Sequence, residues 1–347
     1  MTDPFTNGCQ SQVSPAGVRN TMLRWAVIGT GNMAGQFLQD VAQIVNGRFS
    51  AVYSHSLVRA QAFAETHALT AAYDDYEQLL ADPKIDAVYI ASTHPHHAPQ
   101  AIAALNAGKH VLVEKPMALS EAEAAAVFAA AERNQRFCAE ALWTKFNPLY
   151  QSLHRQVAAG RIGTVQHLSA SFGFAHDMSQ VHHRLLDPAQ AGGALLDIGL
   201  YPIMLALSVF GYPDQTQARV VLGPTGVDIA ADLLLSYADG KTAHLAYRLD
   251  AHLPTKACIS GSKGWVELET PWFACNALQW GETGKPVTSE YGVLLNRGWG
   301  NQFERVNDAI GLGHLAVVEH SWADSVQLAR YLEWLRKTWG PSYPFER

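Results

Sequence analysis

The chain has 347 residues, with 25 Lys+Arg against 31 Asp+Glu and a formal net charge of −6. Its length allows one large domain or two ordinary ones, and a hydrophobic share of 48% supports a substantial core, which excludes global disorder. The longest basic feature is Arg336-Lys337, so the chain lacks the clustered cations that bind phosphate backbones. We therefore expect neither a nucleic-acid partner nor a membrane partner.

Cysteine usage and the N-terminus indicate where the protein works. Cys9, Cys138, Cys258 and Cys275 form no C-x-x-C pair, and four cysteines in this length make no disulfide framework, so we predict a cytoplasmic protein. No apolar run approaches the roughly 18 residues of a membrane span. Residues 1–22 lack the apolar stretch of a signal peptide and are predicted to be a flexible tail or an arm onto a neighbouring subunit.

The first folded part alternates short apolar runs with helical segments. The predicted strands cover residues 25–28, 49–54, 87–91, 110–113 and 137–141. The predicted helices cover residues 33–44, 57–65, 99–107 and, from a capping box of Ser120 with Glu123, 121–134. Strands that alternate with helices imply right-handed crossovers and a parallel sheet covered on both faces. This α/β pattern predicts a first domain over residues 23–143.

The second part of the chain has a different pattern. A helix over residues 148–158 precedes a strand over residues 166–174, and alternating strands follow from Ala218. Asp239-Gly240 and Ser262-Lys263-Gly264 are hairpin signals, which favour an antiparallel or mixed sheet. The chain ends in a predicted helix over residues 321–338. We predict a second domain over residues 144–347 for substrate binding and dimerisation, with the last helix free to pack back on the first domain.

A glycine-rich loop directly follows the first strand and opens a helix. Residues 29–34 spell G-x-G-x-x-A. Gly29 permits the tight turn, Gly31 lets a pyrophosphate approach the backbone, and Ala34 keeps the helix close to the sheet. Early in a βαβ series this pattern favours a dinucleotide site over an empty βα turn. The residues predicted to bind the cofactor here are Gly29, Thr30, Gly31, Asn32, Met33 and Ala34.

The end of the second strand is expected to bind the adenosine ribose. An Asp or Glu there would bind the 2′-hydroxyl of NAD. This chain instead has Ser54 and His55, followed by Arg59, which are donors suited to a 2′-phosphate. The pattern favours NADP over NAD; the alternative is that these are ordinary polar loop residues.

Two further motifs carry chemical groups. Glu114-Lys115-Pro116 follows the strand over residues 110–113, at the sheet edge that faces the ligand crevice. A second run, residues 192–202, combines a Gly pair with Asp197, Tyr201 and Pro202. Asp197 and Tyr201 are spaced to share one helix face. Because Pro202 is tolerated only near a helix start or at a kink, the run is predicted to form the first turn of a helix.

Together, the loop over residues 29–34, the Glu-Lys-Pro motif and the Gly-Gly…Asp…Tyr run resemble the Gfo/Idh/MocA family of oxidoreductases, over roughly residues 22–347. Residues 141–146 and 184–188 look most like its branch of dimeric dihydrodiol dehydrogenases and NADP-dependent D-xylose 1-dehydrogenases. The resemblance implies an N-terminal Rossmann domain with a doubly wound parallel sheet. It also implies a C-terminal α+β domain with a large open, mostly antiparallel sheet, whose exposed face commonly forms a dimer.

The resemblance implies Lys115, Asp197 and Tyr201 as the catalytic group. Tyr201 would be the general acid/base, and Lys115 would bind the substrate hydroxyl. Lys115 and the oxidised nicotinamide, both cations, would lower the tyrosine pKa from its ordinary value of about 10. Asp197 would orient one of them and keep Lys115 protonated. Further cofactor contacts are expected from Ser92, Thr93, His97, Glu114, Lys115 and Trp143, and substrate contacts from Phe174, His183 and Arg184.

Three histidines in residues 94–97 invite a zinc interpretation. We predict that they lie in a loop around a proline, without a cysteine or a clear carboxylate partner, and we expect no metal. The leading hypothesis is an NADP-dependent dehydrogenase acting on a sugar, a cyclic polyol or a trans-dihydrodiol. The alternatives are a carbonyl or ketosugar reductase working in the reverse direction, and a non-catalytic regulator that binds the dinucleotide.

Overall fold

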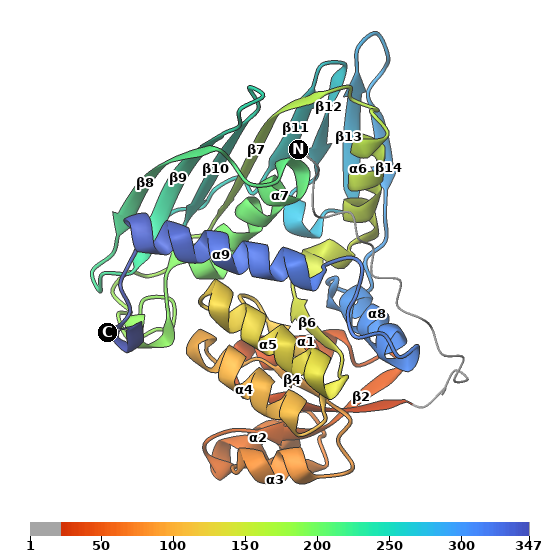
Figure 1. Cartoon of the computed structure of the whole chain (residues 1–347), viewed down its shortest axis with the longest axis vertical. Helices are drawn as coiled ribbons and strands as arrows, with labels where there is room; N and C mark the ends of the chain where they lie inside the picture. Colours follow the sequence, from red (N-terminus) through yellow and green to blue (C-terminus); the bar gives the residue numbers. More distant parts are fainter. Residues whose placement is uncertain (1–21, 347) are drawn as a thin grey trace.

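Two sheets organise the protein (Figure 1). The computed structural model describes residues 22–346, so the predicted tail, apart from Met22, lies outside the described residues. The first sheet has six parallel strands in the order β3-β2-β1-β4-β5-β6. The second has eight strands in the order β14-β13-β12-β11-β7-β10-β9-β8. The predicted fold class, a Rossmann sheet followed by a large open sheet, is confirmed.

The Rossmann part contains six strands and the helices between them. Its strands are β1 (Leu23–Ile28), β2 (Gly47–Tyr53), β3 (Ala71–Tyr73), β4 (Ala87–Ile90), β5 (His110–Glu114) and β6 (Cys138–Ala141). Its helices are α1 (Asn32–Asp40), α2 (Leu57–Thr66), α3 (Tyr76–Ala81), α4 (His94–Asn106) and α5 (Glu121–Asn134). Because β1 pairs in parallel with both β2 and β4, the strand order reverses at β1, and ligands bind at that switch point in such sheets.

The remaining elements build and cover the large sheet, except for one helix that packs on the Rossmann part. Its strands are β7 (Val165–Gly173), β8 (Gln215–Leu222), β9 (Asp228–Ser236), β10 (Thr242–Arg248), β11 (Ala257–Gly261), β12 (Gly264–Leu268), β13 (Ala277–Glu282) and β14 (Thr288–Tyr291). The helices in this part are α6 (Pro148–Ala158), α7 (Leu200–Phe210), α8 (Trp299–Gly311) and α9 (Trp322–Trp339). Both predicted hairpins are present, between β9 and β10 and between β11 and β12. The sheet is mixed because β10 runs parallel to β7.

The start of α4 differs from the prediction. The helix begins at His94 instead of Pro99, so the predicted loop around Pro95 is wrong. Pro95 lies in the first turn, where the missing amide hydrogen has no helical partner in any case, and Pro99 removes only one internal bond. His94 and His97 therefore lie in the first turn of a helix at the sheet's ligand edge.

Helix α8 was not predicted, and it packs on the Rossmann part. Phe303 is fully buried, and its ring lies 5.3 Å from the Trp25 ring and 5.4 Å from the Phe49 ring, measured between centroids. Trp25 Nε1 also donates to Asn307 Oδ1 at 2.8 Å. A segment near the C-terminus of the chain thus completes the core beside β1 and β2.

Helix α9 lies between the large sheet and α5 (Figure 1). Ser321 caps it, and Asp324 returns the reciprocal bond to the Ser321 amide, as the capping pair in the sequence predicts. The Trp322 ring stacks on Phe128 of α5 with a centroid distance of 5.1 Å. The helix therefore holds the two sheets' layers together.

One segment, Pro188–Phe210, is apolar and long enough to cross a membrane, with a mean hydropathy of 1.8. However, 78% of its most apolar stretch of 18 residues is buried inside the protein, and the segment contains Asp197. The segment is therefore explained as the core helix beneath the large sheet.

Candidate active site

The Glu-Lys-Pro motif and the Gly-Gly…Asp…Tyr run meet at the carboxyl end of β5. Glu114 is the last residue of β5, and Lys115 follows it. Residues Leu195–Gly199 form a π turn that runs directly into α7, so Asp197 lies in the turn and Tyr201 is the second residue of the helix. The run is non-helical at Gly192 and Gly193, helical from Ala194 onward, and Pro202 is the third residue of α7.

Lys115 reaches the π turn through two contacts with one residue. Its Nζ donates to the backbone oxygen of Asp197 at 2.6 Å and lies 3.7 Å from Asp197 Oδ1. The same carboxylate oxygen accepts a bond from Arg184 Nη1 at 3.0 Å. Asp197 therefore holds two cations at the mouth of the site.

The backbone contact with Lys115 depends on Pro202. A π turn pairs the carbonyl of residue i with the amide of residue i+5. For Asp197 that residue is Pro202, which has no N–H to donate. The carbonyl oxygen of Asp197 is thus available to the Lys115 ammonium group.

Tyr201 is buried in an aromatic pocket with its hydroxyl bonded. Trp143 Nε1 donates to Tyr201 Oη at 3.0 Å. The rings of Phe172 and Phe273 lie 5.7 and 5.5 Å from the tyrosine ring, and Lys115 Nζ lies 5.3 Å from its centroid. This arrangement fixes the ring between the lysine and the aromatic wall.

The protein groups around Tyr201 disfavour its ionised form. Burial, followed by the charge of Glu114, raises the pKa of Tyr201 above its ordinary value. Tyr201 is therefore a neutral phenol in this arrangement, ready to donate a proton.

Two carboxyl groups near Lys115 have opposite ionisation behaviour. Burial works to raise the pKa of Asp197, but Lys115 and then Arg184 outweigh it, and the pKa falls to about 2. Glu114 is also buried, and burial raises its pKa although Tyr89 Oη donates to it at 2.6 Å. Asp197 is thus the fixed negative charge of the site.

The histidines at the start of α4 line the same edge. His94 Nδ1 lies 3.0 Å from the backbone oxygen of Ala191, and burial, with His97 and Lys115 nearby, lowers the pKa of His94 to about 3. His97 is 1% exposed, and its two ring nitrogens lie 2.8 and 3.1 Å from the backbone oxygens of Pro116 and Ser92. His97 therefore holds the loop after Lys115 against the end of β4.

The glycine loop has the shape that a pyrophosphate requires. Gly29 has φ +107° and passes so close to β4 that a Cβ would lie 2.7 Å from the backbone oxygen of Ala91. Gly31 faces open space and caps α1 without a side-chain bond, which leaves the first amide groups of the helix available. A helix N-terminus of this kind attracts anions, so these residues fit a dinucleotide.

The residues predicted for the adenosine ribose gather at the end of β2. Ser54 is buried, whereas His55 and Arg59 are exposed and their side chains contact each other. Ser56 accepts from the Arg59 amide and caps α2. The exposed imidazole and guanidinium thus lie side by side without a carboxylate bonded to either.

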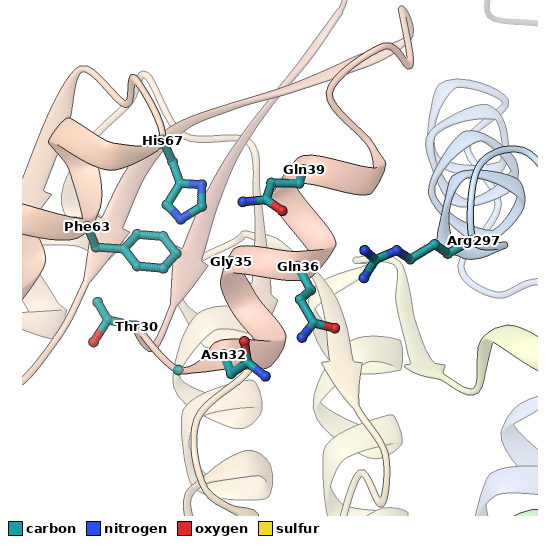
Figure 2. A pocket seen from close by; sticks show the side chains of 9 residues that line it. Thr30, Asn32, Gly35, Gln36, Gln39, Phe63, His67 and Arg297 are labelled. Atoms are coloured by element: carbon teal, nitrogen blue, oxygen red, sulfur yellow. The ribbon is translucent and has the colours of Figure 1, made fainter.

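A polar groove of about 450 Å³ lies beside the loop (Figure 2). Figure 2 shows Gln36 and Gln39 of α1 on one side and Arg297 beside them. Phe63 and His67 of α2 form another wall. The groove contains none of the groups around Lys115, so we assign the chemistry to the Lys115 cluster.

Four other predicted residues have more peripheral positions. Ser92 Oγ donates to Gln100 Oε1 at 2.7 Å, and Thr93 is the N-cap of α4 without a side-chain bond. Phe174 packs near Phe172 at the end of β7. The His183 ring lies against the His176 ring, with centroids 4.5 Å apart and a tilt of 42°, in the loop that also carries Arg184.

Sequence reasoning missed three residues that shape the site. They are Tyr89, which bonds Glu114, Phe172, which packs on Tyr201, and Asp228, which bonds the π turn. The isolated acidic residue in the run Val-Asp-Ile-Ala-Ala is the one sequence signal for Asp228. The other two look like ordinary strand residues.

Known proteins resemble the chain along most of its length. A family model described as an oxidoreductase family with an NAD-binding Rossmann fold matches residues 23–141, and the Gfo/Idh/MocA C-terminal domain matches residues 150–267. A trans-1,2-dihydrobenzene-1,2-diol dehydrogenase of Mus musculus is 32% identical over 94% of this chain and 99% of that protein. The protein of the same name from Danio rerio is 33% identical over 92% and 98%.

Solved structures of similar fold are also named as oxidoreductases. A 3-ketoreductase from Actinomadura kijaniata, in complex with NADP and TDP-benzene, has a TM-score of 0.81 at 23% identity, covering 91% of this chain and 98% of that one. An aldose-aldose oxidoreductase from Caulobacter crescentus has a TM-score of 0.80 at 24% identity, covering 91% and 97%. With the dinucleotide loop and the assembled Lys-Asp-Tyr cluster, the matches of both domains make this chain a member of the Gfo/Idh/MocA family of oxidoreductases.

Proposed function

We propose that the protein is an NADP-dependent dehydrogenase that oxidises a hydroxyl of a sugar, a cyclic polyol or a trans-dihydrodiol. The observation that carries the proposal is the cluster of Lys115, Asp197 and Tyr201 at the ligand edge of the Rossmann sheet. The relatives named trans-1,2-dihydrobenzene-1,2-diol dehydrogenase support a vicinal diol as substrate.

Each residue of the cluster has a distinct role in this proposal. The nicotinamide supplies the acceptor or donor of the hydride. Lys115 binds the reacting oxygen, and Asp197, whose pKa is lowered to about 2, is ionised and holds the ammonium group in place. Tyr201 is the general acid/base: as the tyrosinate it takes the hydroxyl proton when the substrate is oxidised, and as the neutral phenol it gives a proton to the carbonyl oxygen in the reverse direction. Trp143 and the aromatic wall orient the tyrosine and exclude water.

The same site supports the reverse reaction as a second candidate. Burial keeps Tyr201 a neutral phenol, which suits it to protonate a carbonyl oxygen during reduction. A carbonyl or ketosugar reductase therefore needs no additional residue. A non-catalytic regulator would have no use for an assembled cluster, and we place that alternative last.

A cofactor-reduction assay tests the proposal. The purified protein is mixed with NADP or NAD against D-xylose, D-glucose, inositols and trans-dihydrodiols, and in the reverse direction the reduced cofactors are tested with ketosugars. We expect turnover with NADP and a sugar or diol. Binding of the reduced cofactor without turnover in either direction would favour the regulator, and no binding of either dinucleotide would contradict the proposal.

Arg59→Glu is expected to raise the KM for NADP by about tenfold or more, while the KM for NAD changes by less than about threefold. The exposed guanidinium beside His55 is the main cation available to a 2′-phosphate, and a charged hydrogen bond of this type is worth about 1.5–3 kcal/mol. Arg48→Glu, at the exposed start of β2, is the control and leaves both values unchanged. Equal losses for both cofactors in Arg59→Glu would refute NADP selection here.

We also propose that the protein forms a homodimer through the open face of the large sheet. Among residues 22–346, the helices α6, α7 and α9 pack on the other face. At the centre of the open face, Ser169 pairs with His244 on one side and Cys258 on the other, whereas the charged Glu267 and Asp232 lie further out. A broad sheet face without charges at its centre is suited to a second copy.

Sedimentation velocity at micromolar concentration is expected to detect a dimer. Ser169→Arg places a cation at the centre of this face and should convert the dimer to monomers, because an unpaired buried charge is costly. Val318→Arg, at a site 83% exposed away from the sheet, is the control and should remain dimeric. A monomeric wild-type protein would disprove the proposal.

We propose that the protein is cytoplasmic, because its described cysteines are free thiols. Cys138, Cys258 and Cys275 are free thiols in the part of the chain that the structure describes. Cys138 and Cys275 are buried in the core, where burial raises their pKa values above that of a free thiol. Reduced structural thiols of this kind are typical of a reducing compartment.

A further inference from the structure

A buried carboxyl group under the π turn has no part in the proposed chemistry. Asp228 is the first residue of β9 and is 1% exposed. Its Oδ2 accepts the amide hydrogen of Leu195 at 2.7 Å, whereas Oδ1 is buried and has no hydrogen-bond partner among the described residues. Leu195 begins the π turn, so this bond joins the large sheet to the segment that carries Asp197 and Tyr201.

The bond from the Leu195 amide to Asp228 supplies the N-terminal cap that the π turn lacks. The first amide groups of a helical segment have no partner within it, and Ala194, which precedes the π turn, provides no side-chain cap. The carboxyl group of Asp228, on a strand 33 residues further along the chain, accepts the Leu195 amide hydrogen in place of a local cap. The start of the π turn is therefore held by the sheet and not by its own sequence.

The glycine pair explains how the carboxyl group comes this close. Gly193 has φ +125°, and a Cβ there would overlap Asp228 Oδ1. A Cβ on Gly192 would lie 2.6 Å from the backbone oxygen of Arg184. Tyr343 Oη also donates to the Gly192 oxygen at 2.6 Å. The turn is thus clamped between β9, the Arg184 loop and the C-terminal segment.

The surroundings of Asp228 favour its neutral form. Burial raises the pKa of Asp228 to about 7. The titratable or charged groups that face it are Tyr247 of β10, Tyr343 of the C-terminal segment and Arg336 of α9. The unfolded chain loses this proton near pH 4, so ionisation opposes folding as pH rises from about 4 to about 7. Asp228→Asn removes the ionisable group, so its free energy of unfolding should not fall over this pH range.

We propose that Asp228 is a positioning residue, which sets the places of Asp197 and Tyr201 by holding the Leu195 amide from the large sheet. It contacts neither substrate nor cofactor and acts through the π turn. The effect on turnover rests on the function proposed above, whereas the effect on the backbone of the turn does not.

Three variants separate positioning from general stability. Asp228→Ala removes the oxygen that accepts the Leu195 amide hydrogen. Asp228→Asn keeps a side-chain oxygen at the same distance from the backbone. Asp324→Asn, at the cap of α9, is the control for loss of a partly buried carboxylate elsewhere. For each protein we would measure kcat, the Kd of the dinucleotide and the amide hydrogen exchange of residues 193–201. Should Asp228→Ala not fold, Asp228→Ser, whose hydroxyl stops short of Leu195, takes its place.

Asp228→Ala is expected to lower kcat at least tenfold, to change the dinucleotide Kd less than twofold, and to speed exchange in residues 193–201. Displacements of about 1 Å in a reacting group are enough for losses of this size. Asp228→Asn and Asp324→Asn should stay within about threefold of wild-type kcat with unchanged exchange. Unchanged exchange in Asp228→Ala, or equal losses of kcat and cofactor binding, would overturn the inference. If no protein turns over but exchange still responds, the proposed function fails and the positioning of the turn stands.

Discussion

Replacing Tyr201 by Phe is expected to reduce turnover by about 10²- to 10⁴-fold, the usual contribution of a positioned acid or base. The substitution removes only the hydroxyl that accepts from Trp143 Nε1, and the ring keeps its contacts with Phe172 and Phe273. The dinucleotide Kd should change less than threefold, because no other group moves. Steady-state kinetics and fluorescence titration of the reduced cofactor measure the two quantities.

Tyr331→Phe is the matched control for this experiment. Tyr331 is also buried, and its hydroxyl bonds Thr216 of the edge strand β8 at 2.7 Å, away from the Lys115 cluster. We expect a modest loss of stability and no change in turnover. If Tyr201→Phe keeps more than a tenth of the wild-type kcat, Tyr201 is not the acid/base.

Lys115→Met is expected to reduce turnover by about 10²-fold or more and to weaken dinucleotide binding several-fold. A preorganised cation at the reacting oxygen is worth this much when it is removed. The loss also leaves Asp197 with Arg184 as its remaining bonded cation, so the pKa of Asp197 rises from about 2. Unlike Tyr201→Phe, this change disturbs the position of the π turn, because the bond to the Asp197 oxygen disappears.

Lys109→Met separates this effect from the burial of a lysine in general. Lys109 is 7% exposed, and its Nζ donates to the backbone oxygens of Asp82 and Ile85, each at 2.8 Å. The control should lower the unfolding temperature and leave kcat unchanged. A Lys115→Met protein that loses stability but not kcat would assign Lys115 a structural role.

The Rossmann part was predictable wherever local pattern and tertiary packing agree. The strand before Gly29 and the helix after it are both set by the tight turn between them, and the structure contains both. The start of α4 was predicted five residues too late because of Pro95 and Pro99. A proline in the first turn of a helix and a proline in a loop look alike in sequence. Helix α8 carries apolar residues at positions 299, 303, 306 and 310. This spacing is typical of an amphipathic helix, so the sequence contained the signal for α8.

The site was predictable only for residues whose motif is contiguous. Lys115, Asp197 and Tyr201 belong to short motifs that the family resemblance covers, and the structure brings them together. Their roles in catalysis stay predictions. Asp228 was out of reach because its role depends on the meeting of β9 with a turn 33 residues earlier, a contact that no local pattern encodes. The raised pKa of Tyr201 likewise follows from burial, which sequence alone does not measure.

The packing of α8 has a consequence for any attempt to divide the protein. A fragment that stops at residue 143, where the sequence pattern changes, would leave Trp25, Phe37 and Phe49 without the Phe303 ring that covers them. Such a fragment would expose an aromatic surface and invite aggregation. The Rossmann part is therefore complete only when translation has passed residue 311, after the strands of the large sheet have been made.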